Sequence, residues 1–125
     1  SLEISEKIMT HGNQYAETDF TVDMDGEDSS ANVISRSVAK GQSKQLFVSR
    51  INGNCKCSGH TECDAIIMDK ACVTAEPQLT ANDIDASLIH EAAIGKIAGE
   101  QLIKLMTLGL TEQEAEEQII NGFLK

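Results

Sequence analysis

Short apolar runs separated by polar turns fill residues 14 to 90 of this 125-residue chain and restrict this part to folds built mainly from β-strands. The runs lack the spacing of an amphipathic helix. We predict strands at Phe20–Met24, Ala31–Val38, Gln45–Ile51, Ala65–Met68, Cys72–Ala75 and Ala86–His90. A sandwich, a barrel and a solenoid all satisfy this spacing, because six short strands with irregular turns do not fix a topology.

Two details of these runs bear on the choice of topology. Ala65–Met68 is apolar at every position, which indicates either a parallel strand covered on both faces or a short central strand of any sheet. The dipeptide Asn52-Gly53 is a strong hairpin signal if it joins two clear strands.

After Gly95 the pattern changes to helix. Leu102, Leu105 and Met106 lie on one apolar stripe that ends at Gly109, a residue typical of helix C-termini. We therefore expect a β unit over residues 1–95 and a helical unit over residues 96–125.

A second helix begins at a capping box, in which Thr111 and Glu114 satisfy each other's backbone N–H groups. The apolar stripe of this helix consists of Ala115, Ile119, Gly122 and Phe123. Two short helices joined at residues 109–110 should fold as a helical hairpin.

Charge and hydropathy exclude several classes of function. Ten basic against twenty acidic residues give a formal net charge of -10, which disfavours binding to nucleic acid or to anionic membranes. No run approaches the roughly 20 apolar residues needed to span a bilayer. We expect a cytoplasmic protein with reduced thiols, and a start without Met suggests an excised piece of a longer chain.

The densest chemical feature is the segment 55–63, which reads CKCSGHTEC. Thiolates beside an imidazole suit zinc, iron or copper(I), and a thiolate also accepts sulfur. We expect a turn at Gly59 to bring His60 towards Cys55 and Cys57, with Cys63 beginning the next strand. The alternative is a set of isolated thiols lining strands, since four ligands in nine residues are tight for one closed tetrahedral site.

Other motifs fail or have simple explanations. The pair His90-Glu91 begins like a zinc-protease helix, but Ile94 stands where the second histidine is required. Lys96 follows a glycine without the rest of a phosphate-binding loop, so ATP binding is not expected. Cys72 lies in an apolar run and is predicted to be buried.

Three stretches together resemble the SufB/SufD family of iron-sulfur cluster assembly proteins, in its C-terminal half and its SufB-like branch. The first is Gly59–Met68 and the second is His90–Ile97. The third runs from Glu100 through Gly109-Leu110 to Asn121-Gly122-Phe123.

This resemblance implies a right-handed parallel β-helix followed by a C-terminal helical domain. It also implies a scaffold rather than an enzyme, on which iron and sulfur are assembled into a transient iron-sulfur cluster. A SufC-like ABC-type ATPase would dock on the C-terminal helices, and the apolar stripe residues proposed for this contact are Leu102, Leu105, Met106, Ile119 and Phe123.

The resemblance also implies roles for individual residues. Cys63 matches the cysteine that receives sulfur, and Glu91 matches the acid associated with the nascent cluster. His90 matches a histidine at the interface between paired subunits. Cys55, Cys57 and His60 are not general family features, and we place them as further candidate metal ligands.

Two other functions stay open on the sequence. A structural zinc module would hold about one tightly bound zinc ion and unfold on chelation. A pure platform would present its helices to a partner, with incidental cysteines. A truncated solenoid exposes unpaired backbone groups at its end, so we expect a homodimer, or a heterodimer with a SufB- or SufD-like subunit, supplied by a sulfur donor protein.

Overall fold

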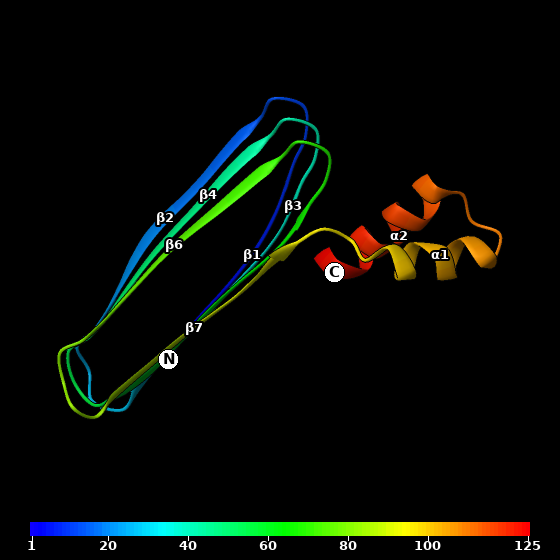
Figure 1. Ribbon diagram of the computed structural model, residues 1–125. Coiled ribbons are helices and arrows are strands. Elements are labelled where there is room, and N and C mark those ends of the chain that lie inside the picture. Colours follow the sequence, from blue (N-terminus) through cyan, green and yellow to red (C-terminus); the bar gives the residue numbers. More distant parts are fainter.

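The computed structural model describes residues 1–125, in which seven strands wind into a solenoid and two helices follow (Figure 1). The strands are β1 (Leu2–Thr10), β2 (Tyr15–Met24), β3 (Ser29–Ala39), β4 (Lys44–Gly53), β5 (Cys57–Ile67), β6 (Cys72–Ala81) and β7 (Ala86–Gly95). The helices are α1 (Gly99–Thr107) and α2 (Glu112–Leu124). The predicted β-solenoid with C-terminal helices is confirmed, although β1 was missed.

Successive strands alternate between two sheets, one in the order β1-β3-β5-β7 and the other in the order β2-β4-β6 (Figure 1). All neighbouring strands are parallel, and each residue lies opposite one that is 28 or 29 positions away, as Leu2 does with Ala31 and Ser29 with Cys57. This arrangement decides among the three topologies that the sequence left open, because neither a sandwich nor a barrel repeats its register in this way.

Side chains alternate between the interior of the solenoid and its outer surface. One corner of the interior is filled by an apolar cluster of Met24, Ala31, Ile51, Cys55 and Cys57. Over most of each strand, a residue therefore faces the core or the outer surface according to its odd or even position; the exceptions are Ser37–Ala39 in β3 and Phe47–Ser49 in β4, where consecutive residues are buried.

The opposite corner of each turn of the solenoid uses the left-handed backbone conformation. Gly12, Gly41 and Asp69 have φ values of 58°, 66° and 56° and occupy equivalent turns in successive layers. The Gly41 N–H donates to the Asp69 carboxylate at 3.0 Å, so the turns are also linked to one another.

Two turns expected from the sequence are absent. Asn52 and Gly53 end β4, and the next strand joins the other sheet, so no hairpin forms there. Gly59 lies inside β5, and the expected turn at this position is wrong. A Cβ at Gly59 would lie 3.0 Å from Leu88 Cδ2, so this glycine serves close packing within the solenoid.

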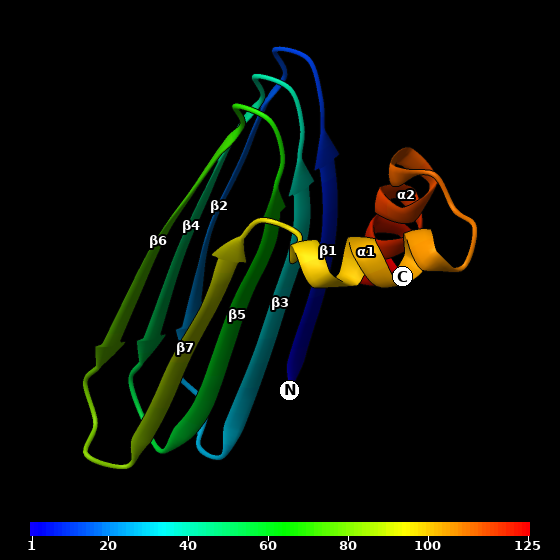
Figure 2. The same cartoon turned by 45° about the vertical axis from the view of Figure 1, so that its right-hand side comes forward.

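The helices form the expected pair, with α2 contacting both α1 and β3 on the outside of the solenoid (Figure 2). The capping box of Thr111 and Glu114 is present, and Gly109 follows α1 with φ 96°. Ala115 and Ile120 are the buried residues of α2, so Ile120 belongs to a stripe from which the sequence analysis omitted it. Neither helix is long and apolar enough to cross a bilayer.

The left-handed corner gives a test of the fold. We expect Gly41→Ala to lower the free energy of unfolding by about 1–2 kcal/mol, because an L-residue is strained at this φ and its Cβ would lie 3.0 Å from the Gly12 nitrogen. Gly26→Ala is the matched control, since nothing lies within 4 Å of its Cβ. Urea unfolding of both variants measures the difference, and equal stabilities would contradict the corner geometry.

Candidate metal and sulfur site

The candidate residues divide between the two faces of the β1-β3-β5-β7 sheet. Along β5, Cys57, Thr61 and Cys63 are buried in the interior, whereas His60 and Glu62 lie on the outer face and are half-buried. Along β7, His90 points inward and Glu91 is exposed. The regular strand therefore places His90 and Glu91 on opposite faces of the sheet, because successive side chains of a strand alternate.

On the outer face, His60, Glu62 and Glu91 bring one donor atom each within 4.8 Å of one another. The His60 Nε2 atom lies 3.4 Å from a Glu91 carboxylate oxygen, and Glu62 is directly opposite Glu91 in the parallel register. One imidazole and two carboxylates form a donor set suited to a divalent first-row metal ion.

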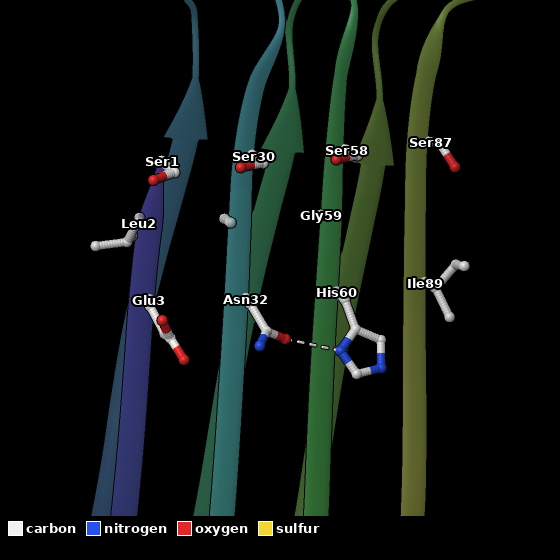
Figure 3. Close-up of a pocket in the computed structure, with 11 residues that line it drawn as sticks. Ser1, Leu2, Glu3, Ser30, Asn32, Ser58, Gly59, His60, Ser87 and Ile89 are labelled. Atoms are coloured by element: carbon white, nitrogen blue, oxygen red, sulfur yellow. Dashed lines mark hydrogen bonds between the residues drawn. The ribbon is translucent and has the colours of Figure 1, made fainter.

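Asn32 on β3 fixes the orientation of the His60 ring. Its side-chain oxygen lies 2.9 Å from His60 Nδ1, and the ring extends from β5 towards β7 (Figure 3). These residues border a shallow polar groove that crosses the N-terminal parts of four strands. Its lining includes the serine row Ser30, Ser58 and Ser87 and the apolar Ile89. The groove gives solvent a route to His60.

Asp64 extends the acidic character of this outer face. Partial burial, followed by its hydrogen bond with Glu62 and the negative charge of that neighbour, raises the pKa of Asp64. The positive charge of Arg36, its partner in the β3–β5 register, acts in the opposite direction.

The inner face carries the sulfur chemistry. Cys63 is 1% exposed, and burial, with smaller effects of the Asp64 and Glu6 charges, raises the pKa of its thiol to about 11. Ser35, the β3 residue opposite Cys63, donates a hydrogen bond to Glu6 within the interior. The position opposite Cys63 on β7 is the small residue Ala92.

His90 lies on the same inner face as Cys63. Its Nδ1 is 2.6 Å from the hydroxyl of Thr61, its partner in the β5–β7 register, while its buried Nε2 has no hydrogen-bond partner. Burial is the largest effect that lowers the pKa of His90, so the neutral ring is favoured there.

Cys55 and Cys57 lie at the corner between β4 and β5 and are 6% and 5% exposed. The Cys55 thiol donates to the Gly26 carbonyl at 3.0 Å, and burial followed by the nearby Cys57 raises its pKa. Both thiols face the interior, as Cys63 does, but Cys57 precedes Cys63 by six residues of extended strand, about 20 Å, and His60 faces outward from β5.

The residues predicted from the sequence therefore lie on both faces of the sheet and form two groups, one inside the solenoid and one outside. The prediction missed Glu62 and Asn32, and only the 28–29-residue register could have aligned Glu62 with Glu91 and Asn32 with His60. Cys72 was predicted to be buried and is exposed, because it begins β6 on the outer face opposite Lys44.

Comparison with known proteins gives a family for this fold and site. The family profile described as "SUF system FeS cluster assembly, SufBD core domain" matches residues 1–123. The chain belongs to the SufBD family. This SufBD chain has the mainly β solenoid and the acid- and cysteine-bearing strands described above.

Curated relatives agree with this assignment. An iron-sulfur cluster assembly SufBD family protein of Methanothermobacter thermautotrophicus (strain Delta H) is 37% identical over 103 residues, covering 81% of this chain and 25% of the relative. Two of Pyrococcus horikoshii are 33% and 35% identical, covering 99% and 98% of this chain and 28% and 38% of those proteins. The SufBD chain thus spans a quarter to about two fifths of these relatives.

Thiol reactivity tests the placement of the cysteines. At pH 8 we expect iodoacetamide to modify Cys72 first and Cys63 slowest, because Cys72 is exposed and the buried Cys63 thiol, with its pKa raised to about 11, remains protonated. Peptide mass spectrometry over time measures both rates, with urea-unfolded protein as the control. Equal rates in the folded chain would contradict the buried position of Cys63.

Proposed function

We propose that this chain is a scaffold component of the SUF system, on which sulfur and ferrous iron are brought together into an iron-sulfur cluster, rather than an enzyme. The observation that carries this proposal is the juxtaposition, in a SufBD core domain, of an imidazole–carboxylate cluster with Cys63 on adjacent strands. We assign sulfur to the inner face and iron to the outer face. A cytoplasmic location and a SufB-like role belong to the same proposal.

Cys63 is the proposed sulfur acceptor. Its thiolate attacks the terminal sulfur of a donor protein's persulfide, a new S–S bond forms at Cys63, and the donor leaves as a thiolate. The transferred sulfur is at the zero oxidation level, so its release as sulfide consumes two electrons from an external thiol or comparable reductant.

The buried state of Cys63 makes this step dependent on a conformational change. With its pKa raised to about 11, the thiol stays protonated at neutral pH. Exposure of the interior to water would lower that pKa towards its ordinary value. We propose that a partner protein exposes the interior by binding at the β7 end of the solenoid.

The free edge of β7 offers the route by which sulfur and iron meet. β7 is the last strand of its sheet, and only Ala92 separates Cys63 from that edge in the register. Sulfur carried by Cys63 on the inner face can pass around this small residue to Glu91 on the outer face. Inward-facing His90 is proposed as a further ligand of the growing cluster. The thiolates of Cys55 and Cys57 lie at the β4–β5 corner, about 20 Å from Cys63 along β5, so as metal ligands they would serve a separate site.

The exposed last layer supports pairing with a second SufB- or SufD-like subunit. Leu79 and Ile94 are each 38% exposed, although Ile51 and Ala65, which precede them in the register, are 0% and 4% exposed. The chain turns into helix after β7, so no further layer covers these side chains within residues 1–125. A like subunit, in a homodimer or a heterodimer, would bury these side chains and enclose the cluster.

The helical hairpin is the proposed docking surface for a SufC-like ATPase. Leu102, Leu105, Ile119 and Phe123 are half-buried, which indicates that they mainly hold the hairpin together. Met106 remains exposed. The exposed apolar side chains of α1 and its C-terminus are Ile103, Met106 and Leu108 at 62%, 44% and 79% exposure.

A closed zinc site made by the 55–63 segment has less support. His60 faces away from Cys57 and Cys63, so the four donors do not surround one point. A pure platform would present its helices to a partner in the same way, but no iron-sulfur cluster would be assembled on it.

Anaerobic reconstitution with ferrous iron, a persulfide-bearing sulfur donor protein and a thiol reductant tests the scaffold. We expect visible charge-transfer absorbance that Cys63→Ser lowers several-fold, because the variant cannot accept sulfur from the donor. Cys72→Ser is the matched control, since Cys72 is exposed on the other sheet, and should retain the absorbance. Undiminished absorbance in Cys63→Ser would refute the role given to Cys63.

A second test concerns the helices. The double substitution Ile103→Ser and Met106→Ser removes exposed apolar surface, so we expect affinity for a SufC-like ATPase to fall about tenfold or more. Gln101→Ala, an exposed position on the same helix, should leave it unchanged. Calorimetric titration gives the affinities, with circular dichroism as the check on helix content. Unaltered binding by the double variant would place the ATPase elsewhere.

A further inference from the structure

We propose that His60, Glu62 and Glu91 form a three-ligand site for a single ferrous ion on the outer face of the sheet, and that Asn32 is its positioning residue. The identity of the ion as iron rests on the function proposed above. The site as a binder of divalent cations stands on the geometry alone.

The carboxylates supply the first argument. Glu62 and Glu91 lie directly opposite each other on adjacent parallel strands, with side chains on the same face. Like charges in this relationship repel one another and destabilise the pairing. A divalent cation between them converts that repulsion into attraction, which explains why the fold tolerates two acids here.

The imidazole supplies an independent argument. With its side-chain oxygen facing His60 Nδ1 at 2.9 Å, Asn32 can only accept a hydrogen bond, so the proton of a neutral ring resides on Nδ1. Nε2 then directs its lone pair at the Glu91 oxygen 3.4 Å away. Two acceptors face each other, and a cation between them satisfies both.

The distances suit a metal ion. Two donors that each lie about 2.1 Å from a tetrahedral or octahedral ion are about 3.0–3.5 Å apart, and the His60–Glu91 pair is separated by 3.4 Å. Three protein donors leave other coordination positions to water or incoming sulfide. Because the Glu91 side chain is 65% exposed, the ion can enter and leave, as a cargo ion requires.

An ion pair between protonated His60 and Glu91 is the competing explanation of the short distance. In that arrangement a proton replaces the metal, and Glu62 is not required. The role of Glu62 therefore distinguishes the two explanations.

The test is an anaerobic titration of the chain with Mn²⁺, followed by the loss of the free-ion electron paramagnetic resonance signal, and repeated with Fe²⁺ by calorimetry. We expect one ion per chain and at least about tenfold weaker binding by Glu62→Gln. Asn32→Ala should weaken binding about tenfold, as loss of an orienting partner typically does, and Asn32→Asp should restore it because a carboxylate still accepts from Nδ1.

One variant serves as the matched control. Glu76→Gln removes an exposed acid on the opposite sheet and should bind Mn²⁺ normally. Absence of Mn²⁺ binding, or equal affinity in Glu62→Gln, overturns the site and favours the ion pair.

Cluster reconstitution of the same variants keeps the two proposals distinguishable. If the wild-type chain forms a Cys63-dependent cluster without binding Mn²⁺, this inference and the assignment of iron to the outer face fail, while the scaffold function of the chain stands. If the chain binds Mn²⁺ through Glu62 but forms no cluster, the cation site stands and the proposed function fails.

Discussion

The in-register pairing of parallel strands is the constraint on which the rest of this structure depends. Of 80 backbone–backbone hydrogen bonds, 61 lie within strands and helices, and the solenoid strands have few other ways to satisfy their backbone. Pairing at 28 or 29 residues, as between Thr10 and Ala39 or Ala39 and Ile67, turns distant positions into neighbours. It also places the inward-facing residues of neighbouring strands next to one another, so that all strands of a sheet share one inner face and one outer face.

The alternation of side chains along each strand gives the site two faces. Cys63 is buried in the interior, where its raised pKa keeps the thiol protonated, while the neighbouring Glu62 is half-buried on the outer face beside another carboxylate. Under the proposed assignment, sulfur on Cys63 would be shielded from oxidation and iron on the outer face would remain accessible, which are opposite requirements for one assembly site. Their separation by a single sheet, with a free edge at β7, lets both conditions hold within a short distance.

Local sequence signals predicted the parts of the fold that depend on local interactions. The capping box at Thr111 and the glycine at Gly109 are such signals, and the structure contains both. The turn expected at Gly59 was wrong, because this glycine packs closely against the side chains of Leu88 and Ile51 from other strands. Burial of Cys72 was wrong for a related reason, since its face depends on the register of β6 with β4.

The candidate site was predictable only in part. Cysteine and histidine density pointed to segment 55–63, and the family resemblance added His90 and Glu91. Neither signal gives the strand register, which places Glu62 opposite Glu91 and His60 beside Asn32. Side-chain direction on a long strand is fixed by packing across layers, so the division between an inner and an outer face required the fold.

The separation of iron from sulfur ligands is tested most directly by iron K-edge X-ray absorption of the chain loaded with Fe²⁺ alone. The account predicts a first shell of nitrogen and oxygen at about 2.1 Å. A sulfur shell at about 2.3 Å would contradict it, because the ion would then be bound by the cysteines of the interior rather than by the outer face.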